Sequence, residues 1–151
     1  MIIYIDADGC PVTDITIKAA VKYNIEAVAV ADTSHYFESE NELVSVLIVS
    51  KGSDSADFAI LSRCKSGDIV VTQDYALAAM CLAKGAHPIN QNGILYTNDN
   101  IDEMLMRRHI NRQIRNAGGR TPHARKRKNE QNEAFSAALY GLINKLLLTN
   151  K

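Results

Sequence analysis

Apolar residues occur in this chain as five short runs, most of them separated by a stretch with helical spacing. The runs are Ile2–Ile5, Ala27–Ala31, Leu43–Val49, Ile69–Thr72 and Ala86–Ile89. Their lengths are typical of buried strands. Strands that alternate with helices are joined by right-handed crossovers and form parallel sheets with both faces covered. The sequence therefore predicts an α/β fold, a three-layer α/β/α sandwich around a mainly parallel sheet of about four or five strands.

Helix signals fill most of the intervals. Helices are expected over about 11–24, from 54, over 74–84 and from near 98, with an exposed loop over 116–130. A final helix carries an apolar stripe made by Phe135, Ala138, Leu139, Leu142, Ile143 and Leu146. That spacing predicts that this C-terminal helix packs on the body of the protein.

Composition excludes several classes of protein. A length of 151 residues, with 46% hydrophobic and 23% charged residues, suits one globular domain. No apolar run approaches the roughly 18 residues of a membrane span, so no membrane partner is expected. The three cysteines never form a Cys-x-x-Cys pair, which argues against a disulfide framework or a zinc knuckle. The first residues lack a basic secretory n-region, and we expect a cytoplasmic protein.

A net charge of zero hides a strong asymmetry. Residues 1–106 contain 15 acidic and 6 basic residues, a net charge of −9. Residues 107–128 contain nine basic and no acidic residues, a net charge of +9. The predicted organisation is one domain with an acidic α/β body (1–106), a basic helix end and loop (107–128) and a C-terminal helix (129–151).

Aspartates follow three of the predicted strands. Asp6 and Asp8 follow the first, Asp54 and Asp57 the third, and Asp74 the fourth. Sites in open parallel sheets lie beyond the carboxyl ends of strands, where the strand order reverses. Two carboxylates 4 Å apart repel by about 4 kcal/mol at an effective dielectric constant near 20, so such a cluster needs a cation or raised pKa values. The five aspartates therefore predict a site for Mg²⁺ or Mn²⁺.

Each of three aspartates also has a structural interpretation. Asp54 and Asp74 suit helix N-cap positions, and Asp57 suits the third helical position, where a carboxylate favours the helix dipole. Asp6 is harder to explain in this way, because it ends an apolar strand that should enter the interior.

Three further residues are auxiliary candidates. Thr72 lies in or just beyond the fourth strand, where its hydroxyl either serves the site or packs in the strand. Cys10 begins a helix and is interpreted as a small packing residue, with a thiol of lowered pKa as the alternative. Lys51 is one of the few bases near the aspartates in sequence.

The chain resembles the YaiI/YqxD family of bacterial proteins. The motifs are Asp6-Ala7-Asp8-Gly9-Cys10-Pro11-Val12, Gly52-Ser53-Asp54-Ser55-Ala56-Asp57, Gly67-Asp68-Ile69-Val70-Val71-Thr72-Gln73-Asp74 and Lys84-Gly85-Ala86, followed by Tyr96-Thr97, Asn100-Ile101 and Gly118-Gly119. The family is placed near the PIN-like nucleases by fold. The resemblance implies a Mg²⁺- or Mn²⁺-dependent phosphodiesterase with Asp6, Asp57 and Asp74 at the acidic positions. Tyr75-Ala76 departs from the Ile-Pro of many relatives and changes the wall of the crevice.

The function expected from these features is a nuclease for single-stranded nucleic acid, and the family analogy favours RNA. An acidic site repels polyanions, so basic residues should attract the phosphates. The candidates are Arg108, Arg112, Arg115, Arg120, Arg125, Lys126, Arg127 and Lys128. The first three share one helix face. The basic segment has no aromatic residue, so it predicts no stacking on bases.

Two other functions fit parts of the pattern. The stretch Ile5–Gly9 is also similar to haloacid-dehalogenase phosphatases, in which Asp6 would be the nucleophile and Asp8 an acid or base. The order disfavours them, because Asp54 and Asp57 precede Thr72 and only Lys84 follows it at a suitable distance. The third possibility is a non-catalytic PIN-like module that binds RNA or a partner.

Overall fold

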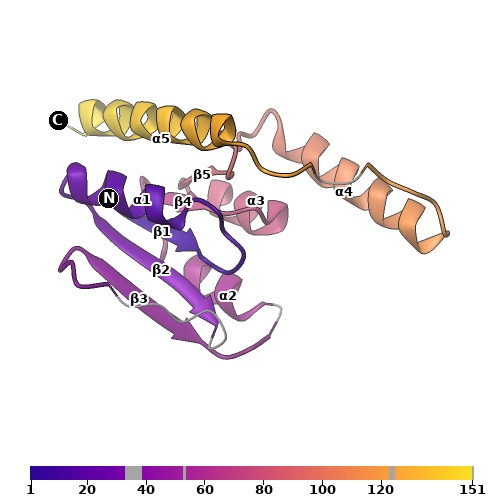
Figure 1. Ribbon diagram of the computed structural model, residues 1–151, viewed down its shortest axis with the longest axis horizontal. Helices are drawn as coiled ribbons and strands as arrows, with labels where there is room; N and C mark the ends of the chain where they lie inside the picture. Colours follow the sequence, from indigo (N-terminus) through magenta and orange to yellow (C-terminus); the bar gives the residue numbers. More distant parts are fainter. Residues whose placement is uncertain (33–38, 53, 123–124, 151) are drawn as a thin grey trace.

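One parallel sheet organises the protein in the computed structural model, which describes residues 1–32, 39–52, 54–122 and 125–150. Its strands are β1 (Ile2–Asp6), β2 (Glu26–Asp32), β3 (Val44–Val49), β4 (Ile69–Val71) and β5 (His87–Ile89). Their order is β3-β2-β1-β4-β5, and every pair is parallel (Figure 1). The predicted parallel sheet is confirmed. Ser53 of the expected turn and positions 123–124 of the expected loop lie outside the described residues.

Helices cover both faces of this sheet. They are α1 (Thr13–Lys22), α2 (Ser55–Arg63), α3 (Tyr75–Ala83), α4 (Ile101–Asn116) and α5 (Asn129–Thr149). The first helix begins two residues later than Pro11, because Val12 is buried in the core as its N-cap residue. Helices α1 and α5 share one apolar cluster with the sheet, and α2 and α3 share another. The three-layer α/β/α arrangement is confirmed.

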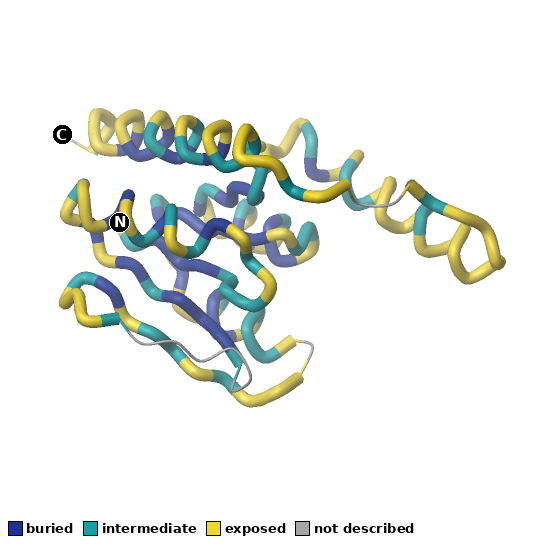
Figure 2. The backbone as a smooth tube through the Cα atoms, viewed as in Figure 1, coloured by how far each residue is buried: buried dark blue, intermediate teal, exposed yellow. Residues whose placement is uncertain are grey.

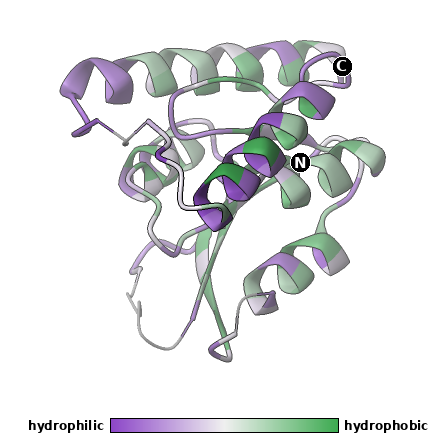
Figure 3. Ribbon diagram, turned by 90° about the vertical axis from the view of Figure 1, so that its right-hand side faces the viewer, coloured by the Kyte–Doolittle hydropathy of each residue, from purple (hydrophilic) through white to green (hydrophobic). Residues whose placement is uncertain are grey.

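Alternation along the central strand separates these two clusters. Ile3 and Ile5 of β1 face α1 and α5, whereas Tyr4 between them faces α2 and α3. The α5 stripe packs on the first face as its spacing predicts, with all its members buried except Ala138, which is partly buried. Hydrophobic residues accordingly colour the strands and the sheet-facing parts of the helices (Figure 3). No helix in the described part of the chain is long and apolar enough to cross a membrane.

Helix α4 leaves the body as an arm. It lies beside α3 near its start and then projects outward, with exposed residues along its outer half (Figures 1 and 2). The chain returns to α5 through a segment anchored by Arg127. Its guanidinium donates to the backbone oxygen of Gln91 at 2.7 Å, to Asn92 Oδ1 at 3.0 Å and to Asn132 Oδ1 at 2.7 Å.

The packing of α5 yields a stability prediction. Replacing the fully buried Phe135 (0% exposed) with alanine leaves a cavity between α5 and the sheet. We expect Phe135→Ala to lower the free energy of unfolding by about 3–5 kcal/mol in urea titration. Leu148→Ala on the same helix, at a side chain 69% exposed, is the control and should change it by about 0.5 kcal/mol or less. Equal effects would contradict the docking of α5 on this face.

Candidate active site

The candidate site lies at the reversal point of the sheet. From β1 the chain proceeds outward through β2 and β3, then returns to place β4 on the other side of β1. The carboxyl ends of β1 and β4 therefore border the crevice at which open α/β sheets bind ligands. Asp6 is the last residue of β1, and Thr72 directly follows β4.

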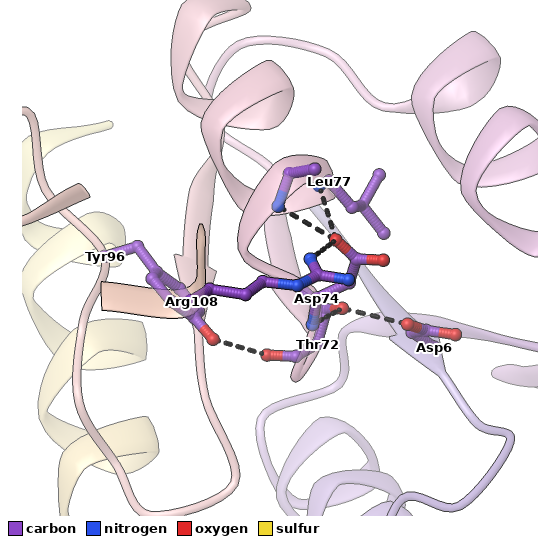
Figure 4. Close-up of polar contacts among 7 residues, drawn as sticks. Asp6, Thr72, Asp74, Leu77, Tyr96 and Arg108 are labelled. Atoms are coloured by element: carbon purple, nitrogen blue, oxygen red, sulfur yellow. Dashed lines mark hydrogen bonds and ion pairs between the residues drawn. The ribbon is translucent and has the colours of Figure 1, made fainter. Parts of the chain in front are cut away.

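The Thr72 hydroxyl joins two aspartates across this crevice. Thr72 Oγ1 donates to Asp6 Oδ2 at 2.9 Å and accepts from the backbone N–H of Asp74 at 3.0 Å (Figure 4). The backbone oxygen of Thr72 in turn accepts from the buried Tyr96 hydroxyl at 3.2 Å. Thr72 is thus held from both sides and fixes the positions of Asp6 and Asp74.

Asp74 combines a structural role with a place in the site. Its Oδ1 accepts from the backbone N–H groups of Ala76 at 2.8 Å and Leu77 at 3.1 Å, which confirms the predicted N-cap of α3. The same oxygen lies 3.5 Å from Arg108 Nη1, on α4 (Figure 4). The basic arm therefore reaches the acidic cluster directly, through an arginine 34 positions along the chain.

Asp57 completes a cluster of three carboxyl groups. It occupies the third position of α2. Burial, the charges of Asp74 and Asp6, a hydrogen bond with Asp74 and the charge of Asp54 raise the pKa of Asp57 to about 6. Burial and the charges of Asp74 and Asp8 also raise the pKa of Asp6, against the lowering effect of its hydrogen bond with Thr72. Negative side chains from three separate segments thus interact in one place.

The other candidates near the cluster are less involved. The carboxylate of Asp8 accepts from the backbone N–H of Asp32 at 3.0 and 3.2 Å, which ties the end of β1 to that of β2. Asp54 is the exposed N-cap residue of α2, with no side-chain capping bond, and Lys51 is exposed in the preceding turn. Cys10 packs against the core, and burial raises the pKa of its thiol, which favours the packing interpretation.

Asp6, Asp8 and Asp74, but not Asp57, line a cavity of about 700 Å³, which we call the acidic cavity. Its walls are Asp6, Asp8, Gly9, Gln73, Asp74, Tyr75, Arg108 and Arg115. It shares Tyr75, Arg108 and Arg115 with a second cavity of about 430 Å³, the α4 cavity, which Arg107, Asn111, Arg112 and Asn116 complete. On its other side it shares Gly9 and Gln73 with the loop cavity, about 340 Å³, which Arg125 and Arg127 also line.

Basic residues therefore flank the acidic cavity on both sides. Arg108, Arg112 and Arg115 line the same cavity, in agreement with their predicted common helix face. Arg120, Lys126 and Lys128 are exposed along the returning segment. Arg127 differs from them, because its guanidinium already has three partners within the protein. A role of these residues in nucleic-acid binding stays a prediction.

Tyr75 lines the acidic cavity, as expected of a residue in the crevice wall, whereas Gln73 was not singled out from the sequence. Gln73 Nε2 donates to the backbone oxygen of Gly9 at 3.1 Å, which holds together the loops after β1 and β4. Both residues flank Asp74 in sequence, and that adjacency was the available signal. Lys84, the lysine that a dehalogenase-like site would need, instead donates to the backbone oxygen of Leu61 at 2.5 Å.

The donor set suits a hard divalent cation. Within the described residues, no three His, Cys, Asp or Glu side chains form a group that could hold a metal ion. Mg²⁺ seldom uses such an all-protein cage, since it is bound through one or two carboxylates, retained waters and substrate phosphates. A cation would favour the charged forms of Asp6 and Asp57, whose pKa values are raised by burial and by the charges of neighbouring carboxylates.

The coupling of Asp57 yields a pH prediction. A raised pKa means that the folded state binds the proton of Asp57 more tightly than the unfolded chain does. The contribution of Asp57 to the free energy of unfolding is therefore largest below about pH 4 and is lost as the pH rises through about 6. With EDTA present, Asp57→Asn should flatten this decline and raise the Tm at pH 7.5 by on the order of 2–4 °C. Asp14→Asn, at an exposed position on α1, is the control. A wild-type decline retained in Asp57→Asn would contradict the coupling.

Comparison with known proteins places the chain in a bacterial family. Residues 4–145 match the family model described as "Uncharacterized BCR, YaiI/YqxD family". A UPF0178 protein from Ruminiclostridium cellulolyticum is 50% identical over 92% of this chain and 90% of its own length. Another, from Exiguobacterium sibiricum, is 45% identical over 95% and 96%. No solved structure matches the chain. Since the matched range covers all but the first three and the last six residues, the chain belongs to the YaiI/YqxD family.

Proposed function

We propose that this protein is a Mg²⁺- or Mn²⁺-dependent phosphodiesterase that cleaves single-stranded nucleic acid, with RNA preferred. The observation that carries the proposal is the convergence of Asp6 and Asp74, joined by Thr72, at the reversal point of the sheet and in the wall of a cavity that arginines also line. The preference for RNA rests on the resemblance to PIN-like nucleases alone.

Asp6 and Asp74 would hold the cation, with Asp57 beside them and Asp8 and Asp54 as auxiliary charges. When bound, such a cation lowers the pKa of water and offsets negative charge on the phosphate. The protein prepares the site in advance, since Thr72 orients Asp6 and the first turn of α3 orients Asp74. Asp57, the third carboxyl group of the cluster, would accept a proton from water.

The arginines of α4 would attract a polyanion to this acidic cluster. Arg108 lies beside Asp74, and Arg112 and Arg115 continue along the same helix. Phosphates bound to them would place the next phosphodiester over the acidic cavity. The positive arm thus compensates the repulsion that the body alone would exert.

Substitution of the carboxylates tests turnover. Asparagine keeps an acceptor for Thr72 at position 6 and for the N-cap at position 74, so the fold should survive. With Mn²⁺ or Mg²⁺, Asp6→Asn and Asp74→Asn should each slow cleavage of a labelled single-stranded RNA by about 100-fold or more, and EDTA should abolish cleavage by wild type. Asp14→Asn should cleave at the wild-type rate.

Two outcomes would contradict the proposal. Wild-type protein that cleaves none of a broad panel of RNAs and DNAs with either metal would exclude a nuclease. Cleavage that survives Asp6→Asn would move the chemistry elsewhere. Metal-independent binding by wild type and Asp6→Asn alike, without turnover, would instead identify a non-catalytic binding module.

The arm makes a separate prediction about salt. In the Asp6→Asn background with EDTA, binding of a single strand should weaken linearly with log salt. Replacing both Arg108 and Arg112 with alanine should flatten the slope by about 1.4, at roughly 0.7 per lost phosphate contact. Lys18→Ala, at an exposed position on α1, is the control. An unchanged slope in the double variant would mean that Arg108 and Arg112 do not contact the phosphates and are simply solvated.

A further inference from the structure

We propose that Tyr75 is a stacking platform on which the protein binds one unpaired base, in the α4 cavity beside the acidic cluster. This inference rests on the proposed function only because it assumes that the ligand is a single-stranded nucleic acid. The basic segment itself has no aromatic residue. The fold supplies one from α3 instead.

Tyr75 lies where the two cavities meet. It follows Asp74 directly as the first residue of α3 and lines both the acidic cavity and the α4 cavity. Arg108 and Arg115 are the other residues of this shared wall. A strand with a phosphate at the carboxylates would therefore bring its neighbouring nucleotide to Tyr75.

The ring of Tyr75 is held in place from behind. It packs edge-on against the Tyr96 ring, with centroids 5.9 Å apart and an interplanar angle of 65°. Tyr96 is only 3% exposed, and its hydroxyl donates to the backbone oxygen of Thr72. The platform is thus fixed through the same residue that positions Asp6. Little ordering entropy should be lost when a base stacks on it.

The chemistry around the ring suits a nucleotide. Arginines 108, 112 and 115 offer phosphate contacts, while the side chains of Asn111 and Asn116 offer amide groups for a base edge. A volume of about 430 Å³ lies within the range of small-ligand pockets. Paired bases of a duplex are stacked on one another and cannot reach such a ring, so the site selects unpaired bases.

The simpler interpretation is that Tyr75 only packs against Tyr96. The chain offers a matched comparison in Tyr140 of α5, which is also half-buried and contacts another tyrosine, Tyr23, with centroids 5.7 Å apart. Tyr140 packs with the cluster on the other face of the sheet. A general loss of tyrosine packing should affect both positions, whereas base stacking should affect Tyr75 alone.

An abasic scan tests the inference by binding alone. All variants carry Asp6→Asn, EDTA is present, and fluorescence anisotropy reports binding of a short labelled oligonucleotide. Tyr75→Leu should weaken binding about 5- to 30-fold, since stacking on an aromatic side chain contributes about 1–3 kcal/mol per base. Tyr75→Phe and Tyr140→Leu should bind within about twofold of the parent. Thermal unfolding checks that each variant is folded.

The scan then locates the base. At one position of the oligonucleotide, removal of the base should weaken binding to the parent protein about as much as Tyr75→Leu weakens binding of the intact strand. The Tyr75→Leu variant and the parent should bind that abasic strand equally well. Unchanged binding in Tyr75→Leu, an equal loss at every abasic position, or no binding by the parent would overturn the inference. If binding depends on Tyr75 but wild-type protein cleaves no strand, the proposed nuclease function is wrong and the stacking site stands. If wild-type protein cleaves the strand but the loss at each abasic position is the same in the parent and in the Tyr75→Leu variant, the stacking site is wrong and the nuclease function stands.

Discussion

The hydroxyl of Thr72 is the contact on which the candidate site depends. It joins two neighbouring strands at the point where the sheet order reverses, by donating to Asp6 and accepting from the N–H of Asp74. A hydroxyl can serve both partners at once because it is donor and acceptor together. Burial, together with the charges of the neighbouring carboxylates, raises the pKa values of Asp6 and Asp57. This balance between hydrogen bonding and repulsion is what a cation would relieve.

The acidic and basic segments, which are separate in the sequence, lie close together in the folded protein. The acidic body and the basic segment carry opposite net charges of equal size, and Arg108 brings them within 3.5 Å at Asp74. Arginine-lined cavities lie on both sides of the carboxylates. An anionic chain could therefore cross the cluster while its phosphates stay paired on either side.

Local sequence signals predicted most of the fold and the positions of the aspartates. Apolar runs and capping residues act within a few positions, and they gave the strand ends and the N-cap at Asp74. The contact of Arg108 with Asp74, the exposure of Tyr75 to two cavities and the internal partners of Arg127 were not predictable in this way. They depend on where α4 leaves the body and how the chain returns, which are tertiary features. The roles assigned to the carboxylates and arginines stay predictions.

The central place of the first strand has a consequence for synthesis of the protein on the ribosome. β1 emerges first, but 62 residues (7–68) separate it from its neighbour β4, and the Asp6–Thr72 bond spans 66 positions. A nascent chain thus carries Asp6 and Asp8 without the groups that organise them. Arg108 arrives later still. The candidate site therefore stays incomplete until synthesis has passed Arg108.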